Sequence, residues 1–134
     1  MNKYILTINS TSDPIEISLL KDFQLVDTNK YPKKNNEAKK LLFEIDKLIN
    51  KNTLNIKNID KIAVSIGEGS YTGTRIGVSI ANALAYALNI EIIELKNSEL
   101  KNCSVGEFMS NTKGKSTILK DMVLPIYSKP PTIT

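Results

Sequence analysis

Three glycines, Gly67, Gly69 and Gly73, lie within seven residues, between an apolar run and a long stretch of small residues. Glycine-rich turns that join a strand to a helix often hold phosphate groups on their backbone N–H groups. No lysine follows a glycine in this turn, as a Walker A loop requires. The third glycine comes one residue late for a dinucleotide fingerprint. Phosphate binding here would therefore depend only on the free N–H groups of a helix start.

The composition excludes several kinds of catalysis. The 134-residue sequence has no histidine and a single cysteine, Cys103. Histidine is the usual general base and the commonest metal ligand, so Ser-His-Asp, Cys-His and zinc chemistry within this chain are excluded. We therefore expect no cofactor and no metal site, and a lone cysteine forms no intrachain disulfide.

The charge is +4, carried almost entirely by lysine. Residues 30–57 hold eight lysines against three acids, and two interpretations stay open: a solvated helix face, or weak attraction to nucleic acid or another acidic partner. The single arginine, Arg75, lies beside the glycine-rich turn. No apolar run approaches the roughly 20 residues of a membrane helix, and the N-terminus does not resemble a signal peptide. We expect a cytoplasmic protein without membrane contact.

The first half of the sequence predicts a meander followed by a helix. Alternation of apolar and polar residues predicts three antiparallel strands, at residues 3–8, 15–20 and 23–27. An apolar stripe at helical spacing predicts a helix over residues 37–50, with Asn35 or Asn36 as its N-cap.

The second half predicts two β-α crossover units. Residues 62–66 are nearly all apolar, which is typical of a central strand covered on both faces. A helix over residues 73–89 and a strand over residues 90–95 follow. Residues 98–120 show no clean period and are expected to form a short helix or loop, before a last edge strand over residues 121–127.

The second helix carries a row of small residues four apart: Gly73, Gly77, Ala81 and Ala85. Glycine inside a helix costs about 1 kcal/mol relative to alanine, so Gly77 needs an offsetting contact. Two alternatives stay open. The row packs closely on the chain's own sheet, or part of this helix meets a partner chain.

The stretch GEGSYTGTRIGVSIANALAYALNI resembles the GPGSFTGLRIG signature of the bacterial TsaB (YeaZ) family. The matching positions are Gly67, Gly69, Ser70, Thr72, Gly73, Arg75, Ile76 and Gly77, with Tyr71 for the usual Phe. Residues 5–11, 35–45 and 124–131 are also similar to segments of this family.

The resemblance implies an α/β fold of the actin, sugar-kinase and Hsp70-like (ribonuclease H-like) class. A single lobe is expected, in which a mixed five-stranded sheet combines an antiparallel meander with two β-α crossovers. Residues 1–97 would form this lobe. Residues 98–134 would be a short remnant of a largely missing second lobe, with a closing segment that packs back on the first.

Three departures from the family pattern matter. The family's first-strand aspartate is Asn9, its signature proline is Glu68, and its histidine before Glu37 is absent. In kinase-like relatives that aspartate helps to position a metal and a phosphate. Its replacement argues against phosphoryl chemistry by this chain alone.

The resemblance also implies a function. The chain would be a non-catalytic dimerization subunit that pairs with a larger TsaD-like subunit. That partner forms N6-threonylcarbamoyladenosine next to the anticodon of tRNAs reading ANN codons. A TsaE-like ATPase would join, and tRNA would be contacted only indirectly. The alternatives are a homodimer through the same helices and a minimal nucleotide- or sugar-phosphate-binding protein.

Two sets of candidate site residues follow from the resemblance and the helix spacing. The predicted partner interface comprises Glu37, Leu41, Leu42, Ile45, Arg75, Ile76, Gly77, Ile80, Ala81 and Leu84. The predicted motif loop comprises Gly67, Gly69, Ser70, Tyr71, Thr72 and Gly73.

Overall fold

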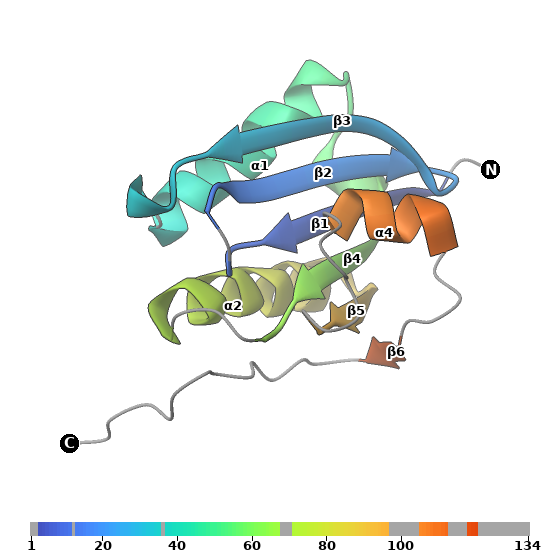
Figure 1. Cartoon of the computed structure of the whole chain (residues 1–134). Helices are drawn as coiled ribbons and strands as arrows, with labels where there is room; N and C mark the ends of the chain where they lie inside the picture. The colour runs from blue at the N-terminus through green and yellow to red at the C-terminus, as the bar shows by residue number, and fades with distance from the viewer. Residues whose placement is uncertain are drawn as a thin grey trace.

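The computed structural model describes residues 3–11, 13–35, 37–67, 71–96, 105–112 and 118–120. These residues form a six-stranded sheet with helices on both faces (Figure 1). The strands are β1 (Tyr4–Asn9), β2 (Ile15–Lys21), β3 (Gln24–Tyr31), β4 (Ile59–Ser65), β5 (Glu91–Leu95) and β6 (Ile118–Lys120). The helices are α1 (Ala38–Lys51), α2 (Tyr71–Leu88) and α4 (Val105–Thr112), with short 3-10 turns η1 (Lys33–Asn35) and η2 (Ile56–Asn58).

The strand order is β3-β2-β1-β4-β5-β6, which puts β1 and β4 at the centre. The first three strands pair antiparallel, and β1, β4 and β5 pair parallel. Helix α1 connects β3 to β4, and α2 connects β4 to β5, as the two expected crossovers. The predicted fold class is confirmed, and β6 adds a short antiparallel strand beside β5.

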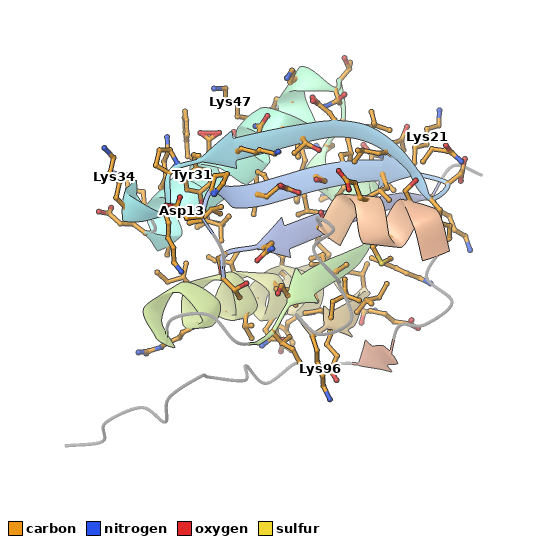
Figure 2. All side chains as sticks on the ribbon, in the orientation of Figure 1. Asp13, Lys21, Tyr31, Lys34, Lys47 and Lys96 are labelled. Atoms are coloured by element: carbon orange, nitrogen blue, oxygen red, sulfur yellow. The ribbon has the colours of Figure 1, made fainter. Side chains whose placement is uncertain are left out.

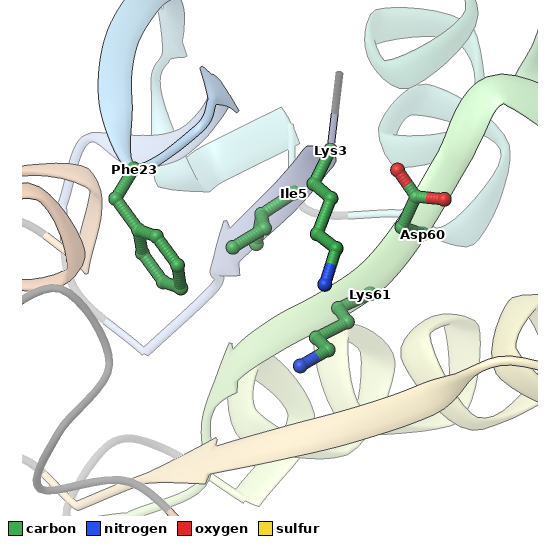
Figure 3. Close-up of a pocket in the computed structure, with 5 residues that line it drawn as sticks. All are labelled: Lys3, Ile5, Phe23, Asp60 and Lys61. Atoms are coloured by element: carbon green, nitrogen blue, oxygen red, sulfur yellow. The ribbon is translucent and has the colours of Figure 1, made fainter. Parts of the chain in front are cut away.

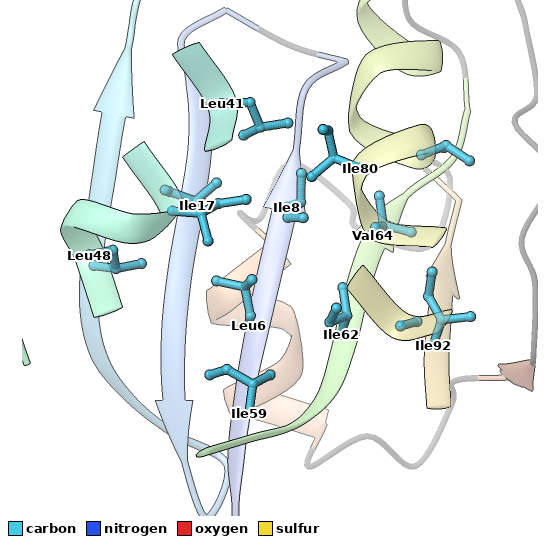
Figure 4. Packing of buried hydrophobic residues seen from close by; sticks show 14 of the residues in the cluster. Leu6, Ile8, Ile17, Leu41, Leu48, Ile59, Ile62, Val64, Ile80 and Ile92 are labelled. Atoms are coloured by element: carbon cyan, nitrogen blue, oxygen red, sulfur yellow. The ribbon is translucent and has the colours of Figure 1, made fainter. Parts of the chain in front are cut away.

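Two hydrophobic clusters fill the two sides of the sheet. The larger lies between the sheet and helices α1 and α2, and includes Leu41, Leu48 and Ile80 (Figure 4). The smaller includes Ile5 from β1 and Met109 from α4, which covers the opposite face (Figure 1). Each fully buried leucine or isoleucine stabilises the fold by about 1.5–3 kcal/mol, so both faces depend on their helices.

Helix α2 comes close to the end of β1 at Gly77. A Cβ added to Gly77 would clash with the Ser10 side chain, just after β1, and would lie 3.5 Å from Ile8 Cγ2. Farther along the same row, Ala81 and Ala85 are buried in the larger cluster. The alternative in which this row packs on the chain's own sheet therefore holds, and the contact accounts for a glycine inside the helix.

The β2–β3 hairpin closes through two residues with left-handed backbones, Asp22 (φ 51°) and Phe23 (φ 63°). Such turns favour asparagine and glycine, so a phenylalanine there is strained. The pairing then skips one residue: Leu19 faces Asp27 and Leu20 faces Leu25, which leaves Val26 as a bulge in β3.

Two boundary predictions were wrong. The third strand runs to Tyr31 instead of ending at residue 27, because its pairing with β2 continues to Ile15, with Lys30 Nζ 3.7 Å from Glu16 Oε2. The N-cap of α1 is Glu37 instead of an asparagine, and it makes no side-chain capping hydrogen bond.

The chain after β5 was predicted least well. Within residues 98–120 the structure places α4 and β6, where the sequence favoured a short helix or loop without a strand. The expected strand over residues 121–127 lies outside the described residues. In the part of the chain that is described, none of the helices combines the length and apolarity needed to span a bilayer.

The contact between Gly77 and Ser10 predicts an unusual response to Gly77→Ala. Alanine should gain about 1 kcal/mol of helix propensity, yet overpacking against Ser10 should outweigh it. We expect a net loss of about 1–2 kcal/mol in the free energy of unfolding by urea denaturation. Ser10→Ala in the same chain should recover part of this loss, and additive effects of the two changes would contradict the contact.

Candidate functional site

Polar side chains gather where the parallel strands β1 and β4 end. Asn9, Ser10, Thr11 and Ser65 are all buried there. In open α/β sheets, ligands bind outside the carboxyl ends of the strands, so this is the position of a phosphate or metal site in a kinase-like lobe. The chain presents an amide and hydroxyl groups in this position instead of a carboxylate.

Internal hydrogen bonds occupy this strand-end cluster. Asn9 Oδ1 accepts from Thr11 N at 3.0 Å and from Thr11 Oγ1 at 2.7 Å. The Thr11 hydroxyl also lies 3.4 Å from Ser65 Oγ, which links the ends of β1 and β4. The amide oxygen is thus engaged with the chain's own backbone, and an amide carries no negative charge to attract a cation.

Lys33 forms two hydrogen bonds with the loop that follows β1. Lys33 Nζ donates to Thr11 O at 3.0 Å, and Lys33 N donates to Asp13 Oδ1 at 3.0 Å. Figure 2 shows Asp13, Lys34 and Tyr31 at this same end of the sheet. These contacts hold η1 against the strand-end cluster, so the cluster is closed by the protein itself.

The predicted motif loop is described in part. Gly67 follows β4 and is buried, and the N–H of the preceding residue, Ile66, donates to Leu95 O at 2.9 Å. The backbone of Tyr71, Thr72 and Gly73 already belongs to α2, which begins two residues before the predicted start. Gly69, Ser70 and the side chains of Tyr71 and Thr72 lie outside the described residues. Among the described residues, no group of three or more acidic, cysteine or histidine side chains could hold a metal ion.

The ten predicted interface residues divide between the core and the surface. Five of them are buried in the chain's own interior: Leu41, Ile45, Gly77, Ile80 and Ala81. Within this chain these five residues belong to the interior between the sheet and the helices, so they are not part of its exposed surface. Ile76 and Leu84 are half-buried against the same core, whereas Glu37, Leu42 and Arg75 are exposed.

The exposed outer face of α1 and α2 contains residues that the sequence prediction missed. Phe43 on α1 is 58% exposed and Tyr86 on α2 is 90% exposed. On α2 a second row at four-residue spacing faces outward, comprising Arg75, Ser79, Ala83 and Ala87. The four-residue spacing pointed to such a row, but did not tell which of two neighbouring rows faces the sheet. We call the exposed residues Leu42, Phe43, Ser79, Ala83, Tyr86 and Ala87 the outer helix face.

The Lys40 side chain, at the start of α1, contacts the Tyr31 ring at the end of β3. Its Nζ lies 3.2 Å from Glu44 Oε2, 5.7 Å from the centre of the Tyr31 ring and 5.4 Å from that of Phe43. Burial and the neighbouring Glu44 charge raise the pKa of Tyr31 to about 12, so its hydroxyl stays protonated. These contacts stabilise the helix next to the exposed Phe43 ring.

The topology and strand-end geometry define a single lobe of the actin, sugar-kinase and Hsp70-like class. The family model described as "TsaD: tRNA N6-adenosine threonylcarbamoyltransferase" matches residues 32–105, more than half of the sequence. The chain therefore belongs to the family that this model describes. The predicted resemblance to TsaB proteins is also confirmed.

Two curated relatives show the extent of the match. The chain is 34% identical over 96 residues to the tRNA threonylcarbamoyladenosine biosynthesis protein TsaB of Bacillus subtilis, covering 71% of this chain and 42% of that protein. It is 26% identical over 96 residues to TsaB of Haemophilus influenzae, covering 72% and 40%. The chain thus spans about two fifths of these relatives.

Solved structures agree on the fold. YeaZ from Pseudomonas aeruginosa superposes with a TM-score of 0.68 at 19% identity, over 84% of this chain and 50% of that chain. Thermus thermophilus RuvC, solved with a Holliday junction substrate, superposes with a TM-score of 0.52 at 7% identity, over 98% and 84%. At these identities the likeness concerns the fold alone.

The strand-end cluster predicts a structural role for Asn9. Asn9→Ala should lower the free energy of unfolding by about 1–3 kcal/mol, because two buried donors of Thr11 lose their acceptor. Asn9→Asp keeps an acceptor in the same place and should lose less. Chemical denaturation of both variants measures the difference, and an unchanged Asn9→Ala protein would contradict the role.

Proposed function

We propose that this chain is a non-catalytic accessory subunit in the formation of N6-threonylcarbamoyladenosine in tRNA. In this proposal it pairs with a TsaD-like catalytic subunit that modifies the adenosine next to the anticodon of tRNAs reading ANN codons. The observation that carries the proposal is the family match over residues 32–105, together with relatives named for this biosynthesis.

The state of the strand-end cluster supports an accessory role. The position where kinase-like relatives use an acid is Asn9, and its oxygen is held by Thr11. A lobe that fills this position with internal hydrogen bonds is better suited to support a partner than to hold a nucleotide and metal itself. The catalytic groups would then belong to the partner subunit.

The outer helix face is the proposed docking surface. Leu42, Phe43 and Tyr86 offer apolar and aromatic area, which is enriched at the centres of protein interfaces. The small side chains of Ser79 and Ala83 leave room for another helix to approach α2 closely. In the proposal, α1 and α2 pack against the equivalent helices of the partner as a bundle, with Arg75 and Glu37 at the rim.

The remaining parts of the assembly follow from the same proposal. A TsaE-like ATPase joins the pair, and the chain acts in the cytoplasm, where tRNA is modified. Residues 1–97 form the docking lobe, and residues 98–134 stand in place of the second lobe. The packing of α4 on β2 and β3 supports the expectation that this part folds back on the first lobe.

Substitutions on the outer helix face test the docking surface. Leu42→Glu should weaken binding to the threonylcarbamoyltransferase subunit of the same genome by about tenfold or more, since burying a leucine contributes about 1.5–3 kcal/mol. Ala83→Arg should have a similar effect by blocking close approach of a helix. Calorimetric titration of the purified subunits measures both, and size-exclusion chromatography reports whether a homodimer uses the same face.

Leu25→Glu is the matched control. Leu25 is 44% exposed, against 45% for Leu42, and it lies next to α4 on the other side of the sheet. It should leave the affinity unchanged. Circular dichroism checks that both variants are folded. If Leu25→Glu and Leu42→Glu then weaken binding equally, the interface does not lie on the outer helix face. Tight binding of Mg-ATP to the isolated chain would instead favour a nucleotide-binding protein.

A further inference from the structure

A small pocket lies at the opposite end of the sheet from the strand-end cluster. Its volume is about 50 Å³, and Lys3, Ile5, Phe23, Asp60 and Lys61 line it (Figure 3). The pocket opens where β1 and β4 begin, beside the β2–β3 hairpin. It has room for a phosphate-sized group but not for a whole nucleotide.

Two ammonium groups line the pocket. Lys3 and Lys61 take part in no ion pair within 4.0 Å among the described residues. Ile5 is in register with Lys61, so Lys3, two residues earlier, lies on the same face of the sheet. Figure 3 shows the amino groups of Lys3 and Lys61 near one another, with the Phe23 ring to one side beyond Ile5.

Three acids lie near the two lysines, and two of them accept hydrogen bonds from backbone N–H groups. Asp60 is an extra residue in β4 where the register with β1 shifts, and its Oδ2 accepts from Tyr4 N at 2.8 Å. Asp22 Oδ1 accepts from Lys3 N at 3.0 Å. Glu91, in register with Lys61, is exposed on the neighbouring strand and does not pair with it. Among the described residues, neither lysine forms an ion pair with these acids.

The hairpin positions Phe23 at some conformational cost. Its left-handed backbone is unfavourable for a bulky residue, and strained residues of this kind cluster at ligand sites. The ring packs against the smaller cluster and closes one side of the pocket. An apolar wall beside two cations lowers the local dielectric and strengthens their attraction for an anion.

We propose that Lys3 and Lys61 bind a backbone phosphate of RNA, with Phe23 against the adjoining sugar or base. The choice of RNA rests on the proposed function in tRNA modification. Lysine binds phosphate as a compact point charge, and an aromatic ring beside the phosphate path is typical of single-stranded or looped RNA. The contact is direct, whereas the chemistry on the adenosine belongs to the partner.

The placement of the pocket allows this contact within the assembly. Ile5 belongs to the smaller cluster, on the face covered by α4, whereas the outer helix face lies on the other side of the sheet. A partner docked on α1 and α2 therefore leaves the pocket open. Binding of RNA and binding of the partner can be measured separately.

The double variant Lys3→Gln and Lys61→Gln tests the proposal. The probe is a fluorescently labelled anticodon stem-loop RNA, titrated with the chain at several salt concentrations and followed by anisotropy. We expect about tenfold weaker binding at low salt, and a slope of log affinity against log salt that is smaller by about one. The variant should keep its affinity for the catalytic subunit.

The matched control is Lys34→Gln with Lys47→Gln, which removes the same charge elsewhere. Figure 2 shows Lys34 at the opposite end of the sheet and Lys47 on α1. An equal loss in the two double variants would mean diffuse attraction and would overturn the proposal. Absence of RNA binding by the unmodified chain, or equal competition by polyglutamate, would also overturn it. Loss of partner binding in Leu42→Glu with RNA binding unchanged supports both proposals. Failure of the unmodified chain to bind the catalytic subunit overturns the proposed function, whereas the phosphate contact of Lys3 and Lys61 is decided by the RNA titration alone.

Discussion

The close approach of α2 to the end of β1, at Gly77 and Ser10, is the constraint on which the arrangement depends. Because a glycine allows the helix backbone to come near the strand, Ala81 and Ala85 follow it onto the sheet. The helix is thereby fixed in rotation about its own axis. That rotation decides which residues are buried, and it turns Ser79 and Ala83 outward, onto the proposed docking surface.

The same constraint links the fold to the proposed function. With α2 held against β1, the polar residues at the strand ends lie beneath the helix and satisfy one another, as the contacts of Asn9 with Thr11 show. The lobe therefore directs two different surfaces outward: an apolar helical face on one side and a lysine-lined pocket on the other. A subunit that supports a catalytic partner needs the first, and contact with RNA needs the second.

The sequence was sufficient to predict the fold class, the five main strands and both crossover helices, because periodicity and the glycine motif agree on them. It did not predict β6 or the length of β3, since three-residue strands and polar edge strands depend on pairing with a neighbour that local patterns do not contain. For the candidate site, it proposed an interface on α1 and α2, and the structure places five of the proposed residues, Leu41, Ile45, Gly77, Ile80 and Ala81, inside the chain. Spacing shows that residues share a face, and only the packed structure shows where that face points.

The bulge at Val26 has a consequence for the behaviour of the free protein. Strand β3 is an edge of the sheet and carries the exposed residues Leu25 and Val26, a combination that invites other chains to add a strand. The extra residue bends β3 and interrupts the regular spacing of its backbone N–H and C=O groups. A straight strand from another chain therefore cannot form a continuous ladder of hydrogen bonds with this edge. The bulge thereby disfavours the addition of another chain's strand to this edge.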